Sequence, residues 1–370
     1  MQDQDAEKGM RGRGRGSEFF VLGHAAWERL WTVPTTNRLN LIIAYLVLLA
    51  GTGADHRLTK WSAKACDDHV GLGKPRARHA IEELIASELI KRTEASTRLK
   101  PQYELLTTPK EDEPIFLPIA LITGLAGEAS MLRRVRETGD ALALRMLIDL
   151  YGLISLDATH GVPLERLQSG KAPDGQHTAR KMAEVGAHAI WGVTPGDRLG
   201  AQGEWTEPHY NGKAKSAPWD AFWSRLHLLK QIGAIWHDPW LFDGEDNDAE
   251  PIMPLDASGF YSVADPTDEA KLTRLALEAA RALVGDEREY LFDSGAEFFV
   301  PLVAHRRTPA YREVVRLRVE ADTPGRRSSF KKRRTLVEQL TSGFDQLRVD
   351  AIEGRYNRPM KLSRAREPVL

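Results

Sequence analysis

The side chains whose types and spacing suggest a chemical role are mostly cations, and clustered cations bind phosphate. Residues 57–80 contain six basic residues and two acidic ones, which gives 6 − 2 = +4. Three of these cations, Lys74, Arg76 and Arg78, gather where a helix is predicted to begin. A helix N-terminus also attracts phosphate through its free N–H groups and its dipole. We therefore expect this segment to contact a nucleic acid.

The place of each cation in the predicted helices and hairpin indicates which part of the DNA it would contact. Arg76, His79 and Glu83 recur at three- and four-residue spacing, so they share one polar edge of a helix. We expect this helix to contact bases or phosphates, two lysines before it to flank the phosphate backbone, and two cations near a hairpin tip to add contacts. The predicted contact residues here are Lys60, Lys64, Lys74, Arg76, Arg78, His79, Arg98 and Lys100.

A second basic cluster lies towards the end of the sequence. Residues 305–334 contain eleven Lys or Arg and three acids, which gives 11 − 3 = +8. Its cations would release counterions from DNA and add sequence-independent affinity, unless they form a solvated or self-paired surface. The predicted contacts are Arg326, Arg327, Lys331, Lys332, Arg333 and Arg334. The acidic stretch 243–269, with a net charge of −9, either masks this cluster or contacts a protein partner.

The remaining patterns argue against an enzyme. The sequence has no phosphate-binding loop, no zinc-protease motif and no nucleophile elbow. His209, His227, His237 and Asp238 do not match a known spacing of metal ligands, and one cysteine excludes both an internal disulfide and a four-thiolate zinc site. We expect no catalysis, no cofactor and no metal, although a nuclease with scattered carboxylates stays an open alternative.

Apolar periodicity predicts the elements that position the first cluster. Helices are expected from Asn37 to about 50, over 60–69 and over 75–89, and they are followed by short strands at 90–92 and 102–105. Glycines 71 and 73 separate the second helix from the third. Three helices of this size can bury one small core and leave the polar edge of the third for a DNA major groove.

The stretch from Thr59 to Arg92 resembles the winged-helix units of bacterial transcription regulators and plasmid replication initiators. The resemblance rests on small residues in the second helix, a glycine-containing turn, the Ala-Ile-x-x-Leu run at 80–84 and a short strand. It implies a winged helix-turn-helix that binds duplex DNA, or one that serves as a protein-binding module. Residues 228–235 parallel residues 84–90, which suggests a second such unit.

These patterns together predict a mainly α fold with short β-hairpins, built from two winged helix-turn-helix units and a C-terminal α/β extension. The expected boundaries are a disordered Gly/Arg arm at 1–18, a first winged-helix domain at 19–108, a linker at 109–139, a second winged-helix-like domain with a long insert at 140–256, and a helical, basic region at 257–370. The tryptophans of the second domain suggest either a packed core or a surface for base stacking or a partner; they are Trp191, Trp205, Trp219, Trp223, Trp236 and Trp240.

The expected function is sequence-directed binding of double-stranded DNA, in replication initiation or transcription regulation of a mobile element. The alternative is a non-catalytic structural or adaptor subunit of a nucleic-acid-processing or defence complex. With 51 Lys and Arg against 52 Asp and Glu, affinity must come from local charge. The longest apolar run, residues 41–50, is about half a membrane span. We therefore expect a cytoplasmic protein that can form a homodimer and does not enter membranes.

Overall fold

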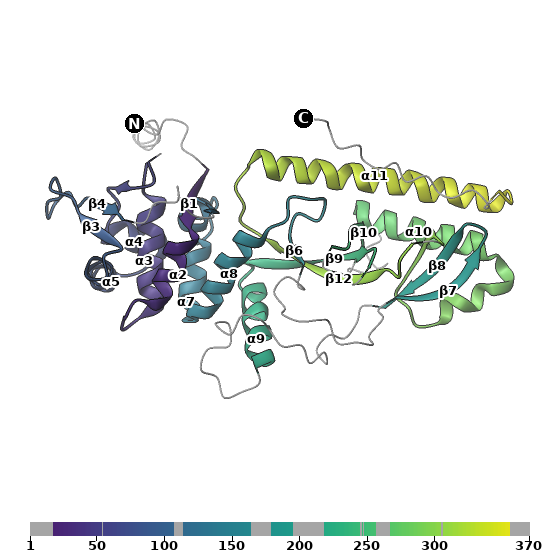
Figure 1. Ribbon diagram of the computed structural model, residues 1–370, viewed down its shortest axis with the longest axis horizontal. Helices are drawn as coiled ribbons and strands as arrows, with labels where there is room; N and C mark the ends of the chain where they lie inside the picture. Colours follow the sequence, from purple (N-terminus) through teal and green to yellow (C-terminus); the bar gives the residue numbers. More distant parts are fainter. Residues whose placement is uncertain are drawn as a thin grey trace. The chain divides into compact units, whose positions relative to one another are not determined.

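The computed structural model describes residues 18–53, 55–106, 114–163, 179–194, 218–244, 246, 248–256, 267–304 and 306–355. The predicted Gly/Arg arm, apart from residue 18, and most of the insert at 168–217 lie outside these residues. The chain forms two compact units (Figure 1). The N-terminal unit comprises Met1–Gly152, Arg225–Ala234 and Arg318–Asp322, and the C-terminal unit comprises Leu153–Ser224, Ile235–Leu317 and Thr323–Leu370.

The three helices predicted around the first basic cluster are present in the N-terminal unit. They are α3 (Arg38–Ala50), α4 (Ala63–Val70) and α5 (Lys74–Ala86). The side chains of Asn37 and Ser62 cap α3 and α4 by accepting hydrogen bonds from backbone N–H groups of their first turns. Helix α4 ends at Gly71, whose φ of 65° is left-handed and favours glycine. The turn at 71–73 therefore sets the angle at which α5 leaves α4.

A small antiparallel sheet completes this part of the unit. Its strands are β2 (Leu58–Thr59), β3 (Ile90–Arg92) and β4 (Tyr103–Leu105), in the order β2-β4-β3. Strands β3 and β4 are the hairpin predicted from the sequence, and the loop between them carries Arg98 and Lys100. Strand β2, between α3 and α4, ties the start of the helix-turn-helix to the hairpin.

The linker predicted at 109–139 is wrong, because its described part is folded. It contains β5 (Pro114–Pro118), α6 (Ala120–Thr123) and α7 (Met131–Thr138). Strand β5 pairs with β1 (Phe19–Gly23), which precedes α2 (His24–Thr32), and it buries Ile115 and Leu117. Pro114 and Pro118 occupy the two ends of a two-stranded pair, where a missing N–H costs little.

The C-terminal unit is built on two antiparallel sheets. One has the order β10-β9-β12-β6, from Pro251–Pro254, Ile235–Phe242, Ala310–Leu317 and Val162–Pro163. The other has the order β11-β8-β7, from Phe298–Val303, His188–Val193 and Ala179–Val185. Helices α10 (Asp268–Val284) and α11 (Pro324–Ile352) pack together, and the 3₁₀ helix η5 (Asp286–Asp293) follows α10. Residues of both sheets and both helices share one apolar core.

The predicted fold class is therefore wrong: the described residues are 48% helical and 22% strand, with four antiparallel sheets. The predicted second winged helix does not form. Helix α9 (Pro218–Gln231) is followed by the eight-residue β9, which pairs along its length with β12, more than 60 residues later. Residues 179–185 form strand β7, although most of them are helix formers, because pairing with β8 overrides local propensity.

The two compact units also do not follow the predicted domain boundaries at residue 140 and between residues 256 and 257. Helix α8 (Ala141–Leu153) belongs almost entirely to the N-terminal unit, and β12 of the last predicted region completes the sheet that β9 begins. Helix α11 is a 29-residue helix that apolar periodicity did not reveal. Among the described helices, none combines the length and the apolar character that a membrane crossing requires.

Candidate nucleic-acid interface

Helix α5 presents its basic residues on two edges. Its buried stripe consists of Ala77, Ala80, Ile81 and Leu84, which face the core of the N-terminal unit. Because successive residues turn by about 100° around a helix, Arg76 and Arg78 project about 200° apart, on either side of the exposed face. The two arginines are exposed. A helix with this arrangement offers one cation to each side of any groove in which it lies.

The cations of this unit differ in whether a carboxylate already neutralises them. Lys74 Nζ lies 4.0 Å from an Asp67 carboxylate oxygen, and Arg57 forms an ion pair with Glu104. Within the described part of the chain, no ion pair involves Arg76 or Arg78. Four further predicted contact residues are exposed and likewise form no ion pair among the described residues: Lys60, Lys64, Arg98 and Lys100.

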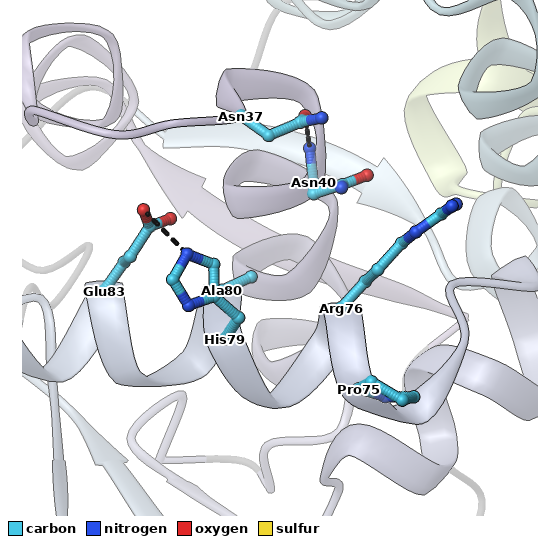
Figure 2. A pocket seen from close by; sticks show the side chains of 7 residues that line it. All are labelled: Asn37, Asn40, Pro75, Arg76, His79, Ala80 and Glu83. Atoms are coloured by element: carbon cyan, nitrogen blue, oxygen red, sulfur yellow. Dashed lines mark hydrogen bonds and ion pairs between the residues drawn. The ribbon is translucent and has the colours of Figure 1, made fainter.

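A pocket of about 310 Å³ lies between α5 and the start of α3. Figure 2 shows Arg76, His79 and Glu83 along one side of α5, facing Asn37 and Asn40. This confirms the shared edge expected from their spacing. The pocket therefore gathers an amide, a guanidinium and an imidazole, and the first two of these groups can form paired hydrogen bonds with base edges.

Sequence reasoning missed Asn40. Its side-chain amide has no hydrogen-bond partner among the described residues, whereas Asn37 Oδ1 accepts the Asn40 backbone N–H at 3.0 Å as the helix cap. The available signal was that a polar residue interrupts the first turn of an otherwise apolar helix. Only the packing of α3 against α5 brings this amide beside Arg76.

Glu83 fixes the geometry of this pocket. One carboxylate oxygen accepts from Thr35 Oγ1 at 2.7 Å, and the other accepts from the Thr36 backbone N–H at 3.2 Å. The imidazole Nε2 of His79 lies 3.4 Å from the second oxygen. Burial alone would raise the pKa of Glu83, but these hydrogen bonds and the neighbouring His79 outweigh it, so the pKa is lowered. The charged carboxylate thus holds α5 to the segment before α3.

We expect Glu83→Gln to destabilise the N-terminal unit by about 1–2 kcal/mol at pH 7, because it removes charge-assisted hydrogen bonds. A lowered pKa means that this stabilisation is complete above the unfolded pKa of about 4.3 and is lost as the pH falls through the lower folded pKa. Urea unfolding at a series of pH values would therefore show the two proteins converging at acidic pH. Glu82→Gln, at an exposed residue, is the control; a difference that persists at acidic pH would contradict the assignment.

The hairpin loop presents a cationic tip. A backbone hydrogen bond from the N–H of Thr97 to the carbonyl of Lys100, at 3.1 Å, closes a tight turn. The Lys100 N–H returns a hydrogen bond to Thr97 Oγ1 at 3.0 Å. Arg98 and Lys100 are exposed at this turn, on either side of Leu99, whose side chain is 93% exposed.

Helix α7 and the residue before it hold the C-terminal end of α4. Ser130 Oγ donates to the His69 carbonyl at 2.9 Å, and Arg136 Nε donates to the Val70 carbonyl at 2.8 Å, so both satisfy the C-terminus of α4. This leaves the N-terminal end of α4, with Lys60 and Lys64, facing solvent. Cys66 is buried on the inner side of α4, and burial raises its pKa to about 12, which makes the thiol unreactive at neutral pH.

The second basic cluster is divided by the structure. Arg333 is buried: its guanidinium donates to Asp238 at 2.5 Å and to Glu269 at 2.8 Å. The prediction that Arg333 contacts DNA is therefore wrong, because α11 turns this residue towards the sheet. Arg334 pairs with Glu338 at 2.8 Å, and Lys332 Nζ lies 3.4 Å from the Leu156 carbonyl.

The other three predicted contacts stay at the surface of α11. Arg327 and Lys331 are exposed, and Arg326 is partly buried with its guanidinium 5.2 Å from the centre of the Phe330 ring.

The described part of the acidic stretch neutralises cations within the C-terminal unit. Besides the pair between Glu269 and Arg333, Asp246 lies 3.6 Å from Arg307, and backbone carbonyls of Gly244 and Asp246 accept from Arg312. These contacts favour the masking alternative at those positions. Residues 257–266 of the stretch lie outside the described residues.

No protein family, curated protein or solved structure matches this chain. Among the described residues, no group of three or more His, Cys, Asp or Glu side chains could hold a metal ion. His209 of the metal cluster considered above lies outside that part of the chain. His237 and Asp238 instead take part in ion pairs, with Glu313 and with Arg333.

Proposed function

We propose that the part of the N-terminal unit from α3 to β4 is a winged helix-turn-helix that binds double-stranded DNA. The order of helices and strands supports this: α4, a glycine turn and α5 form the helix-turn-helix, and β3 and β4 form the wing. In this proposal α5 lies in the major groove. An α-helix with its side chains is about 10–12 Å across, and the groove is about 12 Å wide.

The observation that carries the proposal is the pair of exposed arginines on opposite edges of α5, neither in an ion pair with a described carboxylate. A helix in the major groove has a phosphate backbone on each side. Arg76 and Arg78, about 200° apart, suit contacts on both sides of the helix at once, with a base edge for Arg76, beside the pocket, and a phosphate for Arg78. Arginines that stabilised the fold would instead contact carboxylates or backbone carbonyls, as Arg57 contacts Glu104 and Arg136 contacts the Val70 carbonyl.

The pocket beside Arg76 supports sequence-directed rather than purely electrostatic binding. Arginine forms paired hydrogen bonds with guanine, and asparagine forms them with adenine. We propose that Arg76 and Asn40 read adjacent bases, and that His79, held by Glu83, lies between the two backbones. Residues Arg98 and Lys100 of the wing then contact the neighbouring phosphates or minor groove.

A binding protein of this kind, without catalysis, fits replication initiation or transcription regulation of a mobile element, and we propose that use. Cations of the C-terminal unit add backbone affinity in this proposal: Arg326, Arg327, Lys331 and Lys332 lie at or near the surface of α11, while Arg333 and Arg334 are paired with acids. The proposal includes a homodimer as the form that binds a symmetric site.

Titration of fluorescent duplex DNA at several salt concentrations tests the proposal. We expect the double variant Lys60→Ala with Lys64→Ala to weaken binding equally for every duplex sequence and to reduce the slope of log affinity against log salt by about 2. The matched control is Lys181→Ala with Lys271→Ala, which removes two lysines that already pair with acids in the C-terminal unit. Indifference of the wild-type chain to duplex at low salt would overturn the proposal and favour a protein-binding adaptor.

A further inference from the structure

Two exposed aromatic rings contact the same arginine in the C-terminal unit. Trp236 on β9 and Arg316 on β12 are cross-strand partners. The guanidinium of Arg316 lies 5.3 Å from the centre of the Trp236 ring and 5.2 Å from the centre of the Phe330 ring on α11. Trp236 is 41% exposed and Phe330 is 37% exposed, whereas Arg316 is buried. The arginine thus joins the two rings into one surface, which we call the aromatic pair.

The surroundings hold the aromatic pair in place. Asp238 lies 3.5 Å from the Arg316 guanidinium, and so fixes the group that both rings contact. Arg326 lies over Phe330, and His160 packs against the same ring at 4.9 Å. Among the described residues, only the Arg316 guanidinium stacks on the Trp236 ring, and much of this indole is open to solvent. Rings fixed in this way lose little conformational freedom when a ligand stacks on them.

The charge around the aromatic pair is positive. Residues 323–337 of the α11 segment contain six Lys or Arg and no acid, and of these six Arg333 and Arg334 are paired with acids from outside the segment. Lys331, next to Phe330, is exposed and has no ion-pair partner in the described part of the chain. The same segment forms the beginning of a 29-residue helix, whose dipole adds positive potential. A ligand of this surface therefore combines negative charge with flat apolar faces.

We propose that this surface binds single-stranded nucleic acid, with bases stacked on Trp236 and Phe330 and phosphates on the cations at the start of α11. Duplex DNA fits less well, because its base faces are already stacked on one another. An acidic peptide would use the cations but gain little from the rings. Stacking platforms beside basic grooves are how proteins hold single strands with little sequence preference. The inference does not depend on duplex binding by α5.

Fluorescence anisotropy with labelled 20-nucleotide oligo-dT and oligo-U tests it on the full-length chain. We expect Trp236→Leu and Phe330→Leu, which keep apolar bulk but remove the ring, each to weaken binding by about 5- to 100-fold. Trp236→Phe should restore part of the affinity. The control is Tyr290→Leu, a ring elsewhere in the C-terminal unit that is more exposed than Trp236 and Phe330, and it should leave the affinity unchanged. Comparison of oligo-dT with oligo-U shows whether the surface prefers single-stranded DNA or single-stranded RNA.

Four outcomes decide the proposal. Loss of oligomer binding in both leucine variants, with circular dichroism unchanged, supports it. Equal binding by the leucine variants and the wild type overturns it. So does loss of binding only when Arg76 and Arg78 are replaced, because the strand would then occupy α5. Competition by poly-glutamate as strong as by oligo-dT would also overturn it, since a general polyanion site needs no rings.

Discussion

The double variant Arg76→Ala with Arg78→Ala should reduce the affinity of the full-length chain for duplex DNA by about 30-fold or more. Each contact from an arginine to a base or phosphate contributes about 1–3 kcal/mol, and two are removed. Both side chains are exposed and have no described carboxylate partner, so their loss should not lower the free energy of unfolding. Anisotropy with labelled duplex, at two salt concentrations, measures the change.

Single substitutions to lysine distinguish the roles of the two arginines. Lysine keeps the charge but cannot form the paired hydrogen bonds of a guanidinium. We therefore expect Arg76→Lys, beside the pocket, to change which duplex is preferred in a selection from random sequences. Arg78→Lys should retain most of the affinity and the same preference. This contrast would distinguish base contact at Arg76 from phosphate contact at Arg78.

The control for the double variant is Arg274→Ala with Arg281→Ala, which removes two exposed arginines of α10 and changes the net charge equally. These arginines already interact with Glu278 and Glu289. If the two double variants bound duplex equally well, α5 would have no place in recognition, whatever its shape.

Arg333→Ala should destabilise the C-terminal unit by about 3–5 kcal/mol, the largest stability change that we expect in this chain. The guanidinium contacts Asp238 at 2.5 Å and Glu269 at 2.8 Å, and it lies 5.1 Å from the centre of the Trp240 ring. Burial by itself lowers the pKa of Arg333, but hydrogen bonds to both carboxylates raise it above its ordinary value. Its removal leaves Asp238, 8% exposed, with one compensating charge fewer.

Urea unfolding followed by tryptophan fluorescence measures this loss, and the two compact units can give separate transitions. Lys331→Ala, two residues earlier and exposed, is the matched control and should change stability by less than about 0.5 kcal/mol. Arg333→Lys should fall between them, because it keeps the charge and loses the second hydrogen bond. Equal stability of Arg333→Ala and Lys331→Ala would mean that Arg333 faces solvent, and would return it to the predicted DNA contacts.

Local patterns in the sequence were enough to predict the helices α3, α4 and α5, the β3–β4 hairpin and the edge shared by Arg76 and His79. Apolar spacing, caps and glycine turns act within about one helix length, so each could be read locally. The exposed cations at the start of α5 followed from the same pattern, because the buried stripe leaves them only the outer faces.

The mixed α/β fold, the burial of Arg333 and the place of Asn40 in the pocket could not be predicted in this way. Each depends on partners distant in the sequence: Arg333 and Asp238 are 95 residues apart, and β1 pairs with β5 across more than 90. A strand or a buried charge is stabilised by its partner in another segment, and the local composition around it does not identify that segment. The run of cations in α11 therefore looked uniform, while the fold separated it into surface and core.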